Sequence, residues 1–404
     1  MIEKYYDGAI EQVAAGLGTV EKNYLLVRYS GQFSVENLND TKQLEKNEDI
    51  FVQVHEFETG EITCAYEPYL TMICDGFRRY MTGTFEEFME TCDVYYLHRP
   101  VLLGYFNQDN TGREEIILLD EVAYEQERML AALERMLCAI ADRHPVLFVL
   151  NRFQLASKST IQLTARFLKC ENCNIGLVLG VSDIQAMPEF LVPDWEMLYE
   201  TLDDGSKIYH IGNSGRKKEE TIDDEKYVDY GSEKVYRKLQ NMVEFLDFDQ
   251  AAYYLETIER KIKFDNLLVD DAARFRMWLL FVKVSILRQD IPKALEICED
   301  LEKIHLAGKE EECAYEQDYL IATAYMYQGK LKEALEMAGE TYRIAGKMSD
   351  DYRMFLSELL EAKIQMSGWY NIFFCAQDVK IKESLIQNLI RYNYRNHLAH
   401  VYIY

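Results

Sequence analysis

The chain has 404 residues, of which 49% are hydrophobic, and its 69 acidic residues outnumber the 44 basic ones. This length predicts two domains, and six prolines and twenty glycines are too few for long low-complexity segments. The formal net charge of −25 repels phosphate backbones at long range, which argues against direct nucleic-acid binding by this chain.

Cysteine usage and hydropathy predict a cytoplasmic protein. The nine cysteines are an odd number, and several, such as Cys138 and Cys298, stand in apolar helical patterns. This usage is typical of reduced thiols and not of a disulfide framework. The N-terminal residues show no basic segment followed by an apolar run, and no stretch of about 18 apolar residues occurs. We therefore expect neither a signal peptide nor a membrane as a partner.

The first half of the chain, residues 1–232, predicts an α/β domain. Helical patterns at 125–143 and 159–169 lie between short apolar runs that are rich in branched residues. Such runs indicate strands that are buried on both faces of a parallel sheet, and their alternation with helices indicates a doubly wound layer. The runs span residues 24–29, 50–54, 146–150 and 175–181.

Several segments of this half resemble signal-transduction ATPases of the STAND class. Residues 128–133, 143–154 and 156–160 resemble the second-motif region of that class, and residues 66–73 resemble the segment after its second strand. The resemblance spans about residues 20–215. It implies a P-loop NTPase-like sheet and helical repeats after the ATPase module.

The loop after the first strand lacks the groups that phosphate binding requires. A phosphate loop needs glycines for close backbone approach, a lysine for the phosphates and a hydroxyl for magnesium. In the family alignment Glu36 takes a glycine position, Asn37 the lysine and Leu38 the hydroxyl, so a carboxylate would repel the phosphates. The sequence therefore predicts a degenerate phosphate loop, with Gly31, Ser34 and Asn37 as the candidate cofactor-binding residues.

Two further positions of the resemblance are also replaced. Asn151 and Arg152 stand where the family holds acidic residues for the metal and the attacking water. Ser182 and Asp183 follow the next strand, where the family often has a nucleotide-sensing arginine. We therefore predict no ATP hydrolysis, no catalytic residue, no bound metal and no cofactor. The alternative is a switch of the same class that still binds a nucleotide or another small ligand.

Two other features of the first half are predicted to be structural. The pair Cys170 and Cys173 is a lone CxxC with no second pair or paired histidine, so it lacks the four ligands of a zinc site. A short strand at 207–211 leads to a glycine turn with three basic residues at 216–218, which could hold an anion. The acidic residues at 219–225 neutralise these bases, and an interdomain loop is the preferred interpretation.

The second half, residues 233–404, predicts an all-α helical-repeat superhelix. A similar phrase recurs at 247–251, 290–296 and 329–336, and its alanines, Ala251, Ala294 and Ala334, are 43 and 40 residues apart. Residues 319–329 resemble the first helix and turn of a tetratricopeptide repeat, whose usual period is about 34 residues. A non-repetitive helical bundle is the alternative.

Repeats of this kind predict a protein-binding surface. Tyrosines suit interfaces as well as helix packing, so Tyr315, Tyr319, Tyr325 and Tyr327 are candidate partner-binding residues, with packing as the alternative. Residues 397–404 align with 320–327 and end in mid-repeat, from which we expect a longer protein with an effector after residue 404. The alternative is a natural end that docks onto the body. The predicted function is a non-catalytic scaffold, the sensor half of a transcriptional or signalling regulator.

Overall fold

The structure is a computed structural model. It describes residues 2–17, 24–29, 49–58, 60–108, 121–170, 174–182, 188–202, 208–211, 229–265, 267–371, 383–395 and 397–398. The chain forms two compact units. The first contains Met1–Gly112, Ala123–Asp229 and Glu244–Gln250, and the second contains Arg113–Val122, Tyr230–Val243 and Ala251–Tyr404.

The first unit is built on a five-stranded, all-parallel sheet with the strand order β2-β3-β4-β1-β5. Every residue of β3 and β4 is buried, as the unbroken apolar runs predicted. The sheet confirms the predicted parallel α/β domain. Its strands are β1 (Tyr24–Tyr29), β2 (Phe51–Glu56), β3 (Val146–Asn151), β4 (Ile175–Ser182) and β5 (Ile208–Ile211).

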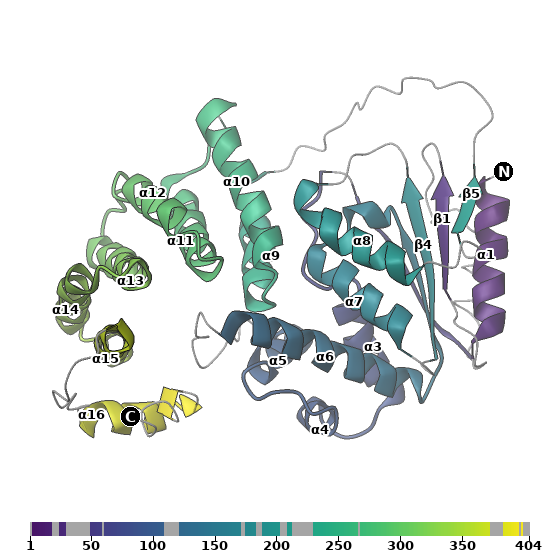
Figure 1. Cartoon of the computed structure of the whole chain (residues 1–404), viewed down its shortest axis with the longest axis horizontal. Coiled ribbons are helices and arrows are strands. Elements are labelled where there is room, and N and C mark those ends of the chain that lie inside the picture. The colour runs from purple at the N-terminus through teal and green to yellow at the C-terminus, as the bar shows by residue number, and fades with distance from the viewer. Residues whose placement is uncertain are drawn as a thin grey trace. The chain divides into compact units, whose positions relative to one another are not determined.

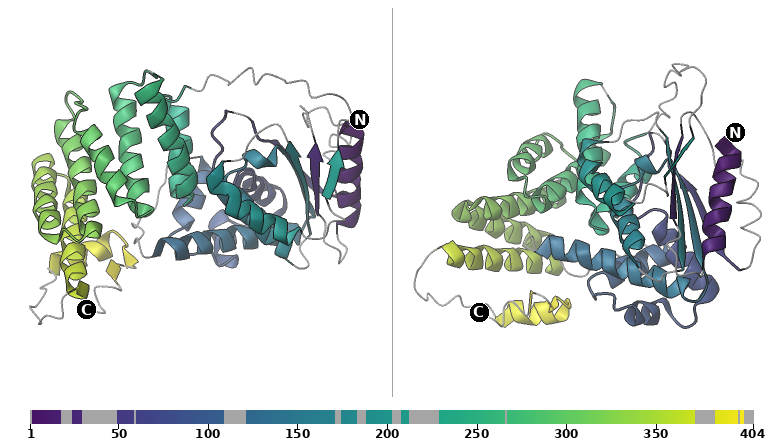
Figure 2. Two further views of the ribbon diagram at one scale, coloured as in Figure 1. Left: turned by 45° about the horizontal axis from the view of Figure 1, so that its top comes forward. Right: turned by 45° about the vertical axis from the view of Figure 1, so that its right-hand side comes forward.

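Helices cover both faces of this sheet (Figure 1). Helix α1 lies on one face, while α3, α7 and α8 lie on the other, as both views of Figure 2 also show. The two helices predicted from periodicity are α6 and α7. The helices of this unit are α1 (Ile2–Gly16), α3 (Tyr69–Tyr80), α4 (Phe85–Thr91), α5 (Arg99–Asn107), α6 (Val122–Ala141), α7 (Lys158–Lys169) and α8 (Val192–Thr201).

Helix α1 packs closely on the sheet because β4 carries a glycine beneath it. Ile10 and Val13 of α1 lie in one buried cluster with apolar residues of β1, β3 and β4. A Cβ atom on Gly176 would lie 2.9 Å from Val13 Cγ1 and 3.0 Å from Leu147 Cδ1. Only glycine leaves room for this approach.

The second unit is helical. Its helices are α9 (Glu233–Glu244), α10 (Phe248–Phe264), α11 (Asp271–Leu287), α12 (Ile291–Leu301), α13 (Glu310–Gln328), α14 (Leu331–Met348), α15 (Asp351–Asn371) and α16 (Glu383–Arg391), with the turn between α9 and α10 belonging to the first unit. From α11 to α16 each helix packs on its neighbour or next neighbour in the chain. Among the described helices, none combines the length and the apolar character needed to cross a membrane.

Small residues mark the close contacts between these helices. Ala251, Ala294 and Ala334 of the recurring phrase are all fully buried. Gly329 ends α13 in the left-handed region, with φ 79°, and so makes the sharp turn into α14 that the sequence predicted. The hairpin of α13 and α14 is thus encoded by local residues.

The close contact at Gly176 predicts a stability effect. Gly176→Ala forces Val13 and Leu147 aside and is expected to lower the free energy of unfolding by about 1–3 kcal/mol in urea denaturation. Gly8→Ala is the matched control, because Gly8 lies within α1 with nothing near its added Cβ, and it should be neutral or stabilise by up to about 1 kcal/mol. Equal urea midpoints for the two variants would contradict this account of the packing.

Candidate functional site

The predicted phosphate-loop residues Gly31, Ser34 and Asn37 lie outside the described residues, as does Asp183. The ends of the neighbouring strands are described, and they form the edge of the sheet at which ligands of parallel α/β folds bind. We call this the carboxyl edge, and its described part contains Glu56, Asn151, Arg152 and Ser182, together with Tyr29.

Asn151 is held by a tyrosine of the strand two places away. The hydroxyl of Tyr29 donates to Asn151 Oδ1 at 2.6 Å, and both side chains are buried. Burial raises the pKa of Tyr29 to about 12, so its hydroxyl stays protonated and remains a donor. The backbone carbonyl of Asn151 also accepts from Phe57 N at 3.1 Å. Asn151 therefore anchors the edge, and its side-chain oxygen already has a donor.

Arg152 places a cation at the carboxyl edge, directly after β3. Its backbone is in the left-handed region, with φ 53°, which is uncommon for a long side chain. Its guanidinium Nη2 lies 3.3 Å from Glu56 Oε1, and this ion pair neutralises the carboxylate at the end of β2. Over the described residues, no group of three or more His, Cys, Asp or Glu side chains is arranged to hold a metal.

The start of α7, which follows β3, is covered by the segment Glu244–Gln250 of the same unit. Ser159 N donates to Asp247 Oδ2 at 3.0 Å, and Lys158 N donates to Gln250 Oε1 at 3.2 Å. The Lys158 ammonium forms an ion pair with Asp249. The first N–H groups of a helix have no partner within it, so these acceptors satisfy groups that would otherwise be orphaned.

Apolar contacts hold the same segment in place. Phe245 is buried and packs edge-on against Tyr66, with ring centroids 6.2 Å apart, and against Tyr105 at 5.8 Å. Leu246 takes a left-handed backbone, with φ 67°, and its carbonyl accepts from Gln126 Nε2 at 2.8 Å. The turn between α9 and α10 is therefore fixed by an aromatic anchor as well as by hydrogen bonds.

Nothing in the local sequence predicts this role for Asp247. It stands directly before α10, just as Asp290 stands before α12 and caps it by accepting from Lys293 N at 3.2 Å. The recurring phrase therefore predicted a local turn at both places. The Asp247 carboxylate accepts instead from Ser159 of another helix, and burial raises its pKa. Local pattern alone does not separate the two uses of an aspartate.

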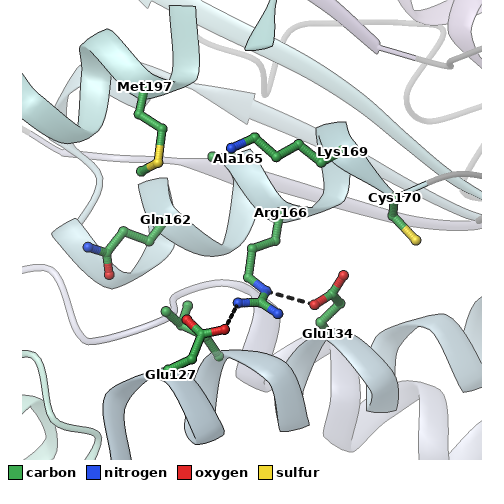
Figure 3. Close-up of a pocket in the computed structure, with 9 residues that line it drawn as sticks. Glu127, Glu134, Gln162, Ala165, Arg166, Lys169, Cys170 and Met197 are labelled. Carbon is green, nitrogen blue, oxygen red and sulfur yellow. Dashed lines mark hydrogen bonds and ion pairs between the residues drawn. The ribbon is translucent and has the colours of Figure 1, made fainter. Parts of the chain in front are cut away.

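A cavity of about 400 Å³ is lined by residues of α6, α7 and α8 (Figure 3). Arg166 crosses it, donating through Nε to Glu134 Oε2 at 2.7 Å and pairing with Glu127. The cavity is also lined by Leu130, Gln162, Ala165, Lys169, Cys170 and Met197. The two carboxylates already compensate the guanidinium, so this cluster ties α6 to α7. The structure describes Cys170 of the CxxC pair but not Cys173.

The four candidate tyrosines of the second unit differ in exposure. Tyr315 is buried, and its hydroxyl donates to the carbonyl of Arg353 at 3.0 Å. Tyr319 stacks on it with ring centroids 6.0 Å apart, and burial raises the pKa of Tyr319. Tyr325 is half-buried, whereas Tyr327 is 39% exposed. Tyr315 and Tyr319 therefore pack between helices, and Tyr327 is the member most open to solvent.

Comparison with known proteins finds no relative, since no protein-family model and no curated protein matches the chain.

The hydrogen bond from Ser159 to Asp247 predicts a local effect on α7. Asp247→Ala leaves that buried N–H without its acceptor, so we expect a loss of about 1–3 kcal/mol in stability and faster amide exchange at the start of α7. Asp290→Ala is the control, because it removes a local cap and should leave α7 unaffected. Hydrogen-exchange mass spectrometry of peptides covering residues 156–164 measures both; unchanged exchange in Asp247→Ala would refute the assignment.

Asp318 of α13 predicts a dependence of stability on pH. Burial, with Glu340 and Glu302 nearby, raises its pKa from 3.8 to about 6, so the folded state favours the protonated carboxyl. Stability should therefore fall as the pH rises from about 4 to about 6. Asp318→Asn should raise stability at pH 7 by about 1 kcal/mol, since solvent screens this half-buried group, and should have no effect at pH 3.5.

The control for Asp318 is Glu336→Gln, which removes an exposed carboxylate from the neighbouring α14. Thermal unfolding at several pH values compares the two variants with the unmodified chain. A stabilisation by Asp318→Asn that is equal at pH 3.5 and pH 7 would show that charge is not its cause.

Proposed function

We propose that this chain is a non-catalytic regulatory or scaffolding module whose helical second unit binds a protein partner. The observation that carries the first part is the state of the carboxyl edge. Asn151 is tied to Tyr29, and Arg152 is paired with Glu56, at the positions where the resembling ATPases hold acids. The sheet is parallel throughout, which is what the resemblance implies.

The chemistry of this edge opposes metal-dependent hydrolysis. Magnesium prefers hard, anionic oxygen ligands, and phosphoryl transfer depends on a metal that bridges the phosphates. In place of these acids the chain has Asn151, whose amide oxygen accepts from Tyr29, and Arg152, whose guanidinium would repel a metal cation. The α/β unit is thus suited to a structural role.

The packing of the second unit supports partner binding. From α11 to α16 the main contacts of the described helices are with near neighbours in the chain, the pattern expected of a helical array. Tyr327, Tyr342 and Tyr352 are each exposed by 38–41% of their surface, and tyrosine is enriched at protein interfaces. We propose that this array recognises a protein, and that the chain is the sensor half of a transcriptional or signalling regulator.

Two measurements test the proposal. Purified chain with Mg²⁺ and ATP should release no more phosphate than buffer alone, because the one carboxylate named in the described part of the edge, that of Glu56, is paired with Arg152; steady turnover would overturn the non-catalytic assignment. In affinity purification from the native host, Tyr327→Ala should reduce capture of the partner by about tenfold, while Tyr124→Ala, which alters an exposed tyrosine of the first unit, should not. Equal capture by both variants would exclude the surface around Tyr327.

A further inference from the structure

Among the described residues near the carboxyl ends of β1, β3 and β4, three N–H donors are buried without a hydrogen-bond partner. They are Gln154 Nε2, Trp195 Nε1 and Arg28 Nε. The side chains of Gln154 and Trp195 are only 4% and 2% exposed, and Arg28 is half-buried. More than nine in ten buried polar groups in native proteins have a partner, so three exceptions in one region call for an explanation.

Strand pairing and one hydrogen bond place Gln154 and Arg28 near each other. In the parallel pair of β1 and β4, Arg28 lies beside Val181 and the next residue lies beside Ser182. Ser182 N donates to Gln154 Oε1 at 3.2 Å, so the glutamine reaches across to the end of β4. Gln154 is therefore held next to the strand pair that carries Arg28.

Aromatic contacts connect the turn after β3, which carries Gln154, to Arg28. Phe153 packs edge-on against Trp195, with ring centroids 5.6 Å apart, and Trp195 lies 5.4 Å from the ring of Tyr199. The Arg28 guanidinium lies 4.9 Å from the centre of the Tyr199 ring and also donates to its hydroxyl. These contacts connect β1, β4, the turn after β3 and α8 in a closed circuit. We call this circuit of contacts the ring, and the residues with the three unpaired donors, Gln154, Trp195 and Arg28, all belong to it.

The polarity of this ring is fixed. Tryptophan and arginine side chains offer only donors. The Gln154 amide has one orientation, because turning it would set its NH₂ group against the Ser182 N–H. Every unpaired group is therefore a donor, and one of them belongs to a permanent cation. The complement of such a set is an anionic oxygen, which accepts several hydrogen bonds at once.

The ring also lies where α/β sheets bind ligands. It includes residues at the carboxyl ends of β1 and β4. The sheet changes direction at β1: β2, β3 and β4 lie on one side of this strand, and β5 lies on the other side. Open parallel sheets bind ligands outside the carboxyl ends of the strands at such a change of direction. We propose that Gln154, Trp195 and Arg28 bind an anionic oxygen of a small carboxylate or phosphate ligand without a metal. This site is independent of partner binding by the second unit.

The test uses the full chain and simple anions. Thermal unfolding and isothermal titration calorimetry are run with sodium phosphate, sodium pyrophosphate and sodium citrate, with EDTA present and ionic strength matched with chloride. At least one anion at 10 mM should raise the unfolding temperature by about 2 °C or more. A response to the phosphates alone identifies a phosphoryl ligand, and a response to citrate alone identifies a carboxylate. No response to any of the three would overturn the proposal.

Two variants and a control assign the response to this ring. Gln154→Glu keeps an acceptor for Ser182 N but replaces the free donor by a carboxylate, so it should weaken anion binding at least about tenfold. Trp195→Phe removes the indole N–H together with part of the ring, and should also weaken binding by about tenfold. Gln12→Glu makes the same charge change on the exposed side of α1 and should bind anions as the unmodified chain does.

Trp195→Phe also separates this proposal from an ordinary structural role. Because the phenylalanine ring is smaller, Trp195→Phe should lower the unfolding temperature of the ligand-free protein, so the readout is the further shift that an anion produces. A ligand-binding N–H requires this anion-dependent shift to be lost, whereas a purely structural N–H leaves it unchanged. Anion binding that is retained in Trp195→Phe would overturn the site. Equal loss of binding in Gln12→Glu would show a response to net charge, with the same consequence. Trp195→Phe keeps the test decisive if Gln154→Glu does not fold.

Discussion

The backbone N–H groups at the start of α7 need acceptors from outside their helix, and much of the first unit is arranged around that need. Asp247 and Gln250 accept from Ser159 and Lys158, and the Lys158 ammonium pairs with Asp249. The contact brings the turn between α9 and α10 into the first unit, although the helices on either side belong largely to the second. A buried carboxylate at this point is tolerated because it is hydrogen-bonded, and the positive end of the helix favours it.

The same helix is also tied to the segment before α3. Ser159 Oγ accepts from Tyr66 N at 3.0 Å, and Thr160 Oγ1 donates to the carbonyl of Glu67 at 2.9 Å. Tyr69, the first residue of α3, shares a hydrogen bond of 2.6 Å with Thr164 of α7 and packs against Phe148 of β3. These hydrogen bonds and aromatic contacts therefore fix the positions of α7, α3 and β3 relative to one another.

The carboxyl edge combines features that suit anions and oppose metals. Arg152 cancels the charge of Glu56, and the Tyr29 hydroxyl engages the oxygen of Asn151. A short distance along the edge, the groups left without partners are all donors. These residues therefore offer hydrogen-bond donors, and the carboxylate of Glu56 is already paired. Such a set of groups suits an anion that binds without a metal.

The sequence by itself determined the elements and their broad arrangement into two kinds of structure. Continuous branched apolar runs fixed the strands, because residues buried on both faces of a sheet have no reason to alternate in polarity. Ala334 and Gly329 specify the α13–α14 hairpin, because close helix contacts and left-handed turns depend on the residue at that position. The position of Asn151 and Arg152 at the end of a buried strand could also be predicted from local sequence.

Only the tertiary structure decided which residues meet across the chain. Ser159 and Asp247 are 88 residues apart, and an aspartate before a helix looks the same whether it caps its own helix or another. Tyr315, Tyr319 and Tyr327 could not be told apart in a tyrosine-rich segment. In the structure, packing between helices buries Tyr315, whereas Tyr327 is exposed. The sequence does not predict a role for Gln154 and Trp195, because an unpaired donor is defined by its neighbours in space, and these neighbours come from separate strands and helices.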